Sequence, residues 1–289
     1  MSKINLDLIL NRVDKLPTLP TVAHEVGNLV NDPDASSRDI ADLIKQDQSL
    51  TARVLALVNS AYYSVPGGIA DVQRAISYLG FNTVYQLVLT ISIFDTLPTS
   101  SSSFSIKELW KHSLGCAIAS ETTGRHLGYK APEELFTAGL LHDIGKVVLA
   151  SFFSSTLEEI VRQTEKEGCT FSEKERELGL PGHDEVGRRL AEKWRLPAPL
   201  MAGIGFHHVL RPEGRLTLPR HLHPVADIVA LGDALCRRGH IGNAGDPMVL
   251  EPDQQVLERL NLTDLAVNRI QDDIPRAIER SKTFLELLG

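Results

Sequence analysis

Apolar residues recur with helical spacing along nearly the whole chain. One such face has the spacing i, i+4, i+7, i+8 and consists of Leu50, Val54, Leu57 and Val58. Ser49 is placed to cap that helix, while Asp71 and Gly80 are placed to begin and end another. Segments that alternate apolar and polar residues between turn residues are hard to find, so strands should be few or absent. The sequence therefore predicts an all-α protein.

The composition excludes several classes of protein. The apolar stretches at 87–94 and 147–153 fall short of the roughly 20 residues that cross a bilayer, so no membrane partner is expected. The first ten residues lack the pattern of a secretory signal, which favours a cytoplasmic location. A formal net charge of −7 opposes binding to the phosphate backbone, so no nucleic-acid partner is expected. The isolated Cys116, Cys169 and Cys236 form no CxxC pair and are expected to be reduced thiols.

A small-polar segment, PTSSSSFS at residues 98–105, divides the chain. We expect an N-terminal helical bundle, residues 1–98, packed on a second helical subdomain, residues 104–289. The side chains with evident chemistry all follow this segment.

The chain after this segment carries a succession of imidazole and carboxylate side chains: Glu108, His112, His142, Asp143, His183, His207, His208 and Asp233. Glu108 and His112 are four residues apart in a helical stretch and share one face, and His142 and Lys146 repeat that spacing. Imidazole nitrogen and carboxylate oxygen suit a divalent transition metal such as Fe, Mn, Zn or Co. Two or three ions at one site would activate water and neutralise phosphoryl charge, as in phosphoester hydrolysis. Asp143 and Lys146 are then the expected catalytic residues, with Lys146 on a phosphate oxygen.

Three of these positions, and two tyrosines before the small-polar segment, have a second interpretation. Glu108 could be an ordinary exposed carboxylate of a helix, and His208 an outward-facing neighbour of the preceding histidine. Lys146 could neutralise excess negative charge in the cluster instead of holding a phosphate. For the tyrosines at 62 and 63 the alternatives are a recognition loop and structural packing, and packing is favoured because Tyr combines a large apolar body with a polar tip.

Longer phrases of the sequence carry a resemblance to known families. The HD superfamily of metal-dependent phosphohydrolases is similar in the phrases LLHDIGK, around His142, and GHDEVGRRLAEKWRLP, around His183. The HDOD family, an HD-related output domain of bacterial signalling proteins, is similar over about residues 12–235 in LPTLPTVAHEV, DIADLIKQDQSLTARVLALVNSAYY and AISYLG. This resemblance implies an all-α fold and a regulatory role, with signalling proteins and a nucleotide or cyclic dinucleotide as possible partners.

A further likeness bears on the substrate. The pairs His207–His208 and Glu108–His112 resemble those of the HD-GYP family, which hydrolyses cyclic di-GMP with two or three metals. The loop HHVLRPEGRLTLP lacks the GYP phrase of that family. The leading interpretation is therefore a cytoplasmic, HDOD-type signalling protein that retains a di- or trinuclear metal site. One alternative is a phosphohydrolase acting on a nucleotide or cyclic dinucleotide, and another is a scaffold whose metal is purely structural.

Overall fold

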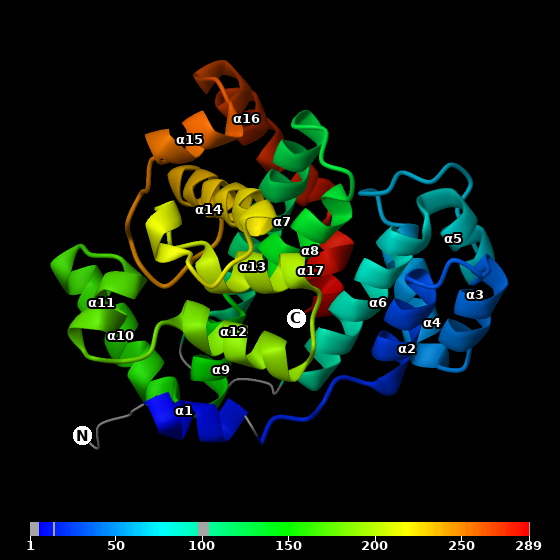
Figure 1. The fold of residues 1–289 in the computed structure, drawn as a ribbon, viewed down its shortest axis with the longest axis horizontal. Coiled ribbons are helices and arrows are strands. Elements are labelled where there is room, and N and C mark those ends of the chain that lie inside the picture. The colour runs from blue at the N-terminus through cyan, green and yellow to red at the C-terminus, as the bar shows by residue number, and fades with distance from the viewer. Residues whose placement is uncertain (1–5, 14, 98–103, 289) are drawn as a thin grey trace. The chain divides into compact units, whose positions relative to one another are not determined.

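A computed structural model describes residues 6–13, 15–97 and 104–288, and no strand occurs among them (Figure 1). The predicted all-α fold is confirmed. Contacts divide the chain into two compact units. The larger unit comprises Met1–Leu16 and Pro98–Pro275, and the smaller unit comprises Pro17–Leu97 and Arg276–Gly289.

These units differ from the predicted subdomains, 1–98 and 104–289, at both ends of the chain. Helix α1 (Leu6–Val13) packs on α12 (His183–Lys193) in the larger unit, and α17 (Lys282–Leu288) packs on α4 (Gln48–Val58) in the smaller one. Composition cannot show such exchanges, because each end packs on a helix far away in the sequence. Most of the predicted linker at 98–105 lies outside the described residues.

The smaller unit is a bundle of short helices: α2 (Thr21–Val30), α3 (Ser37–Lys45), α4, α5 (Val72–Leu79), α6 (Phe81–Thr96) and α17. The four predicted apolar residues of α4 are buried. Its N-cap is Asp47 and not the expected Ser49, because the Asp47 carboxylate accepts a bond from the backbone N–H of Leu50 at 3.0 Å. Asp71 caps α5 as expected.

The loop after α4 is held by one amide side chain. Asn59 Oδ1 accepts from the backbone N–H of Ile69, and Asn59 Nδ2 donates to the Ile69 carbonyl oxygen, both at 2.7 Å. The rings of Tyr62 and Tyr63 lie against Phe284 of α17, with centroids 5.7 and 6.4 Å away. Structural packing therefore accounts for the two tyrosines within this unit.

The larger unit is built around α7 (Ile106–His126), α8 (Pro132–Leu141) and α14 (His223–Arg238), which pack on one another (Figure 1). Its remaining helices are α1, α9 (Ile144–Phe152), α10 (Ser154–Glu167), α11 (Phe171–Glu177), α12, α13 (Ala198–Phe206), η1 (Pro212–Gly214), η2 (Arg220–Leu222), α15 (Gln254–Leu260) and the part of α16 (Asp264–Arg280) up to Pro275. The stretch Pro132–Phe152 is long and apolar enough to cross a membrane, but 89% of its most apolar window is buried. It is apolar because it lies in the core.

A glycine in the phrase LLHDIGK brings two of these helices into backbone contact. A Cβ placed on Gly145 of α9 would lie 1.9 Å from the carbonyl oxygen of His183, at the start of α12. No residue with a side chain fits this approach without moving one helix. The contact sets His183 beside the His142–Asp143 pair.

Candidate metal centre

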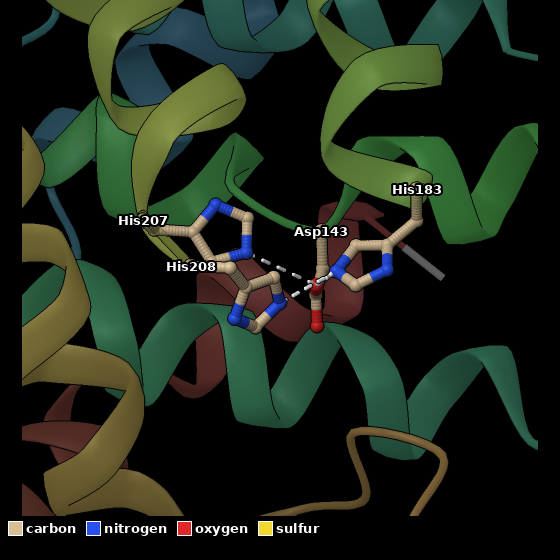
Figure 2. A group of neighbouring side chains, drawn as sticks. All are labelled: Asp143, His183, His207 and His208. Carbon is tan, nitrogen blue, oxygen red and sulfur yellow. Dashed lines mark hydrogen bonds and ion pairs between the residues drawn. The ribbon is translucent and has the colours of Figure 1, made fainter. Parts of the chain in front are cut away.

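Seven of the eight predicted ligand residues converge in the interior of the larger unit. Six have almost fully buried side chains and His208 is half-buried. The contributing positions are His112 on α7, His142 and Asp143 between α8 and α9, His183 at the start of α12, His207 and His208 after α13, and Asp233 on α14. Figure 2 shows four of them, with the three imidazoles directed at the Asp143 carboxylate.

The two oxygens of Asp143 face different imidazoles. Asp143 Oδ1 lies 3.1 Å from His183 Nε2 and 3.9 Å from His207 Nε2. Asp143 Oδ2 lies 3.4 Å from His142 Nε2 and 3.9 Å from His112 Nε2. One carboxylate thus lies between two groups of imidazole nitrogens.

Asp233 and His208 complete these two groups. Asp233 Oδ1 lies 3.0 Å from His112 Nε2 and 3.9 Å from His142 Nε2. His208 Nε2 lies 2.9 Å from His183 Nε2. We call the two groups the carboxylate-rich set, which consists of His112, His142, Asp143 and Asp233, and the histidine-rich set, which consists of Asp143, His183, His207 and His208. The potential ligand atoms of the histidine-rich set all lie within 4.8 Å of one another.

Hydrogen bonds on the far side of the rings orient three of the imidazoles. The Nδ1 atoms of His142 and His207 lie 2.7 and 3.0 Å from main-chain carbonyl oxygens one turn earlier in the chain. His183 Nδ1 lies 2.8 Å from Glu175 Oε2 of α11. A proton on each Nδ1 leaves the Nε2 lone pair free to face the cluster, which is the usual arrangement of histidines that bind metal.

Four atoms at the centre of the cluster have no hydrogen-bond partner. Nε2 of His112, His142 and His207 and Oδ1 of Asp143 are buried and have no hydrogen-bond partner. Buried polar atoms are normally paired, so a convergent group of unpaired acceptors calls for a ligand. Divalent cations supply what these lone pairs lack, and the residues fit them in type, number and orientation.

Lys146 is placed to neutralise charge. Its ammonium donates to Asp143 Oδ2 and to the carbonyl oxygen of Ala244, both at 2.8 Å, and its nitrogen lies 4.9 Å from the ring centroid of Phe171. The side chain is fully buried. These contacts fit the second interpretation of Lys146 and leave its ammonium inside the protein instead of open to a phosphate.

Arg237 holds the other carboxylate. Its Nε donates to Asp233 Oδ1 at 2.8 Å, and its NH1 group donates to both oxygens of Asp246 at 2.7 Å. Asp246 in turn accepts the backbone N–H of Phe171 at 2.9 Å, at the start of α11. Sequence reasoning missed Glu175, Arg237 and Asp246. Only Arg237 had a signal, since it follows Asp233 by four residues on one helix.

The pKa values of the clustered residues are shifted in different directions. Burial and the neighbouring His142 lower the pKa of His207 to about 3. Burial also opposes charge on His183, but Glu175 and Asp143 outweigh it and raise the pKa of His183 to about 9. Burial disfavours the carboxylate of Asp143 as well, yet His142 and Lys146 hold its pKa well below the usual range.

The structure does not bring Glu108 into the cluster. Its carboxylate is 43% exposed and lies 3.9 Å from Lys111 Nζ. The chain at Gly242 and Asn243 packs against this part of α7, where Asn243 N–H donates to the Glu108 carbonyl oxygen at 3.0 Å. In the first turn of α7 the Glu108 carboxylate stays open to solvent beside Lys111, so the expected i, i+4 partnership with His112 does not form at the cluster.

Two cavities adjoin the cluster. One, of about 190 Å³, is lined by His207, His208 and Asp233 together with apolar residues of α14, so side chains of both sets adjoin it. The other, of about 220 Å³, is lined by His112, Arg237 and the chain from 240 to 248. Catalytic metal sites keep an open position, whereas structural sites are closed.

Comparison with known proteins finds one matching family model and several proteins of similar sequence or structure. The HDOD domain model matches residues 16–210, within the predicted 12–235. An HDOD domain protein of unknown function from Geobacter sulfurreducens has a similar structure, with a TM-score of 0.78 and 29% identity over 96% of this chain and 98% of that one. A proposed phosphohydrolase from Shewanella amazonensis SB2B shares the fold at 24% identity, with a TM-score of 0.70 over 97% of this chain and 98% of that one. An uncharacterized protein from Treponema pallidum (strain Nichols) is 27% identical over 230 residues, or 79% of this chain and 44% of that longer protein.

Proposed function

The chain belongs to the HDOD domain family, and we propose that it is a signal-transduction module whose cluster binds two divalent transition-metal ions. The ions would serve to bind the phosphate of a nucleotide or cyclic-dinucleotide ligand, and a signalling protein would read the result. The observation that carries the proposal is the convergence of four buried, unpaired acceptor atoms on and around Asp143. Fe, Mn, Zn and Co suit this mixture of imidazole and carboxylate.

The residues of the chain have distinct tasks in this proposal. His112, His142 and Asp233 would hold one ion, His183, His207 and His208 the other, and Asp143 both. Bound ions of this kind supply positive charge to phosphate oxygens and can lower the pKa of a bound water. Lys146 and Arg237 keep the two carboxylates ionised and oriented through bonds of 2.8 Å.

The cavity beside the cluster is where a ligand phosphate would enter. His207, His208 and Asp233 form its inner wall, and no Lys or Arg is among the residues that line it. A phosphate there would depend on the ions for its counter-charge. Removal of the ions should therefore abolish nucleotide binding, as a metal-gated regulatory role requires.

A second candidate is a metal-dependent phosphohydrolase, and the same cavity favours it because an open edge gives a substrate and a water access to the ions. The alternative of a purely structural metal is less well supported, since a structural site would be closed on all sides.

Metal content tests the proposal. The purified chain, saturated with Mn or Zn and desalted, should contain close to two ions per chain by elemental analysis. The double variant His142→Ala/Asp143→Ala should lose most of them, whereas His126→Ala, at the last residue of α7, should not. Unchanged metal content in the double variant would contradict the assignment of the cluster.

Turnover separates the two candidates. The loaded chain is incubated with a panel of nucleotides and cyclic dinucleotides, and products are separated by chromatography. Binding without products supports the regulatory module. Rapid, metal-dependent hydrolysis that Asp143→Ala abolishes would replace it with the phosphohydrolase.

A further inference from the structure

We infer that the two donor sets are unequal and fill in order, so that the chain responds to the concentration of free metal. The histidine-rich set binds the first ion and retains it, and the carboxylate-rich set takes up the second only at a higher concentration. This inference rests on the proposed two-ion centre and concerns how that centre is regulated.

The two oxygens of Asp143, the carboxylate that both sets share, have different partners. Asp143 Oδ2, which faces the carboxylate-rich set, already accepts a bond from the Lys146 ammonium at 2.8 Å. Asp143 Oδ1, which faces the histidine-rich set, is bonded to no Lys or Arg and has His183 Nε2 as its nearest partner, at 3.1 Å. An oxygen paired with an ammonium is a weaker ligand, and the ammonium charge repels an incoming cation. An oxygen that faces only imidazoles is free of this repulsion by a fixed ammonium charge.

Asp233 repeats the asymmetry on the same side. Its Oδ1, the atom nearest His112, accepts a bond from Arg237 Nε at 2.8 Å. Both carboxylate oxygens that face the carboxylate-rich set are therefore already paired with cations. Lys146 and Arg237 have side chains only 0% and 4% exposed, so solvent screens their repulsion of a metal ion poorly.

The histidine-rich set has the opposite surroundings. It offers three imidazoles to one carboxylate oxygen, and its His183 carries the buried carboxylate of Glu175 on Nδ1 at 2.8 Å. A carboxylate behind a ligating imidazole raises its basicity and fixes its orientation, and loss of such a partner typically weakens metal binding about 10–100-fold. No bond from Lys or Arg to His183, His207 or His208 occurs in the described chain.

Function follows from this order. Both Asp233 of the carboxylate-rich set and His207 and His208 of the histidine-rich set line the 190 Å³ cavity, so a ligand there meets both ions. The second ion would complete the phosphate site. Nucleotide binding should thus begin only when free metal is high enough to fill the carboxylate-rich set.

A cobalt titration tests the order. The full chain is stripped with a chelator and titrated with Co(II) at pH 8, followed by calorimetry and by visible absorption, which reports nitrogen ligation. We expect two binding events whose dissociation constants differ by about tenfold or more. Asp233→Asn should remove the weaker event and spare the tighter one, and His183→Ala should do the reverse.

Charge variants test the cause without removing a ligand. Lys146→Gln and, independently, Arg237→Gln should tighten the weaker event, and Glu175→Gln should weaken the tighter one about 10–100-fold. The matched control is Lys174→Gln on α11, whose side chain is equally buried but pairs with Glu167 and Glu177 outside the cluster. Circular dichroism identifies the variants that keep the fold. If a variant does not fold, the titration of the unmodified chain still tests whether the two binding events differ in affinity.

The outcomes separate the inference from the proposed function. Absence of any Co(II) binding to the folded chain would overturn the two-ion centre itself. Two ions bound with equal affinity, or a tighter event that Asp233→Asn removes and His183→Ala spares, would overturn the order and leave the centre standing.

Discussion

Replacement of Gly145 by alanine tests how the fold builds the cluster. The added Cβ would lie 1.9 Å from the His183 carbonyl oxygen and 3.0 Å from the Gly187 nitrogen. Both are main-chain atoms of α12, which cannot rotate away as a side chain does. Since a Cβ needs roughly 3 Å, α9 and α12 have to separate by about 1 Å.

The size of the effect follows from two opposing terms. Alanine is better than glycine in a helix by about 1 kcal/mol, whereas overpacking a core costs about 1–3 kcal/mol and sometimes more. Because the added Cβ of Gly145→Ala meets backbone atoms, its overpacking cost should lie at the upper end of this range. We therefore expect the free energy of unfolding to fall by about 2 kcal/mol or more. For a domain of about 150–250 residues this lowers Tm by roughly 4–8 °C. A shift of His183 by about 1 Å also exceeds the roughly 0.2 Å tolerance of metal–ligand distances, so metal content should fall.

Thermal melts of chelator-treated protein isolate the packing term, and elemental analysis follows the metal. Gly205→Ala on α13 is the matched control, because the three atoms nearest its Cβ belong to the side chain of Arg188, the nearest of them at 2.7 Å, and not to the backbone. It should melt close to the parent and keep its metal. A metal-free Gly145→Ala variant that melts as the parent does would show that the two helices accommodate the added Cβ.

Three further predictions concern the metal, the ligand and the smaller unit. As the pH rises from 5 to 9, the difference in Tm between metal-loaded and chelated protein should widen. The pKa of His183 is raised to about 9, so its imidazole must lose a proton before Nε2 can bind metal. A difference in Tm that shrinks as the pH rises would contradict this. In metal-free protein the same proton stabilises the fold fully below the unfolded pKa of about 6.5, and this contribution is lost as the pH rises through 9. Hydrolysis of cyclic di-GMP, followed by chromatography, should be weak or absent, since the loop after His208 lacks the GYP phrase; rapid turnover would refute this. Residues 1–98 expressed alone should bind an exposed-hydrophobe dye, because they lack Phe284, which packs on Tyr62 and Tyr63; a soluble fragment that melts cooperatively without binding dye would argue against it.

The seven clustered residues were predictable as candidate ligands because their chemistry is rare and their motifs are local. His142 and Asp143 are adjacent in the sequence, so the local sequence alone indicates a metal-binding pair. Glu175, by contrast, is an ordinary glutamate in the charged run SEKERE. Only the return of the chain from α11 to α12 places its carboxylate 2.8 Å from His183 Nδ1.

Glu108 shows the converse limit. Spacing of four residues places two side chains on one helical face, but it does not say which face the rest of the chain covers. The approach of Gly242 and Asn243 to α7 decides this, and that approach depends on a loop more than 130 residues away in the sequence. The pairing of α1 with α12 and of α17 with α4 escaped prediction for the same reason, since nothing local to either end specifies its partner.

Anomalous diffraction from crystals of the metal-saturated chain, measured at the absorption edge of the bound metal, tests the two-ion centre most directly. The account predicts two peaks about 3.5–4 Å apart on either side of the Asp143 carboxylate. One should lie among His183, His207 and His208, and the other among His112, His142 and Asp233, with the second peak weaker when metal is limiting. A single peak at full saturation, or peaks away from Asp143, would contradict it.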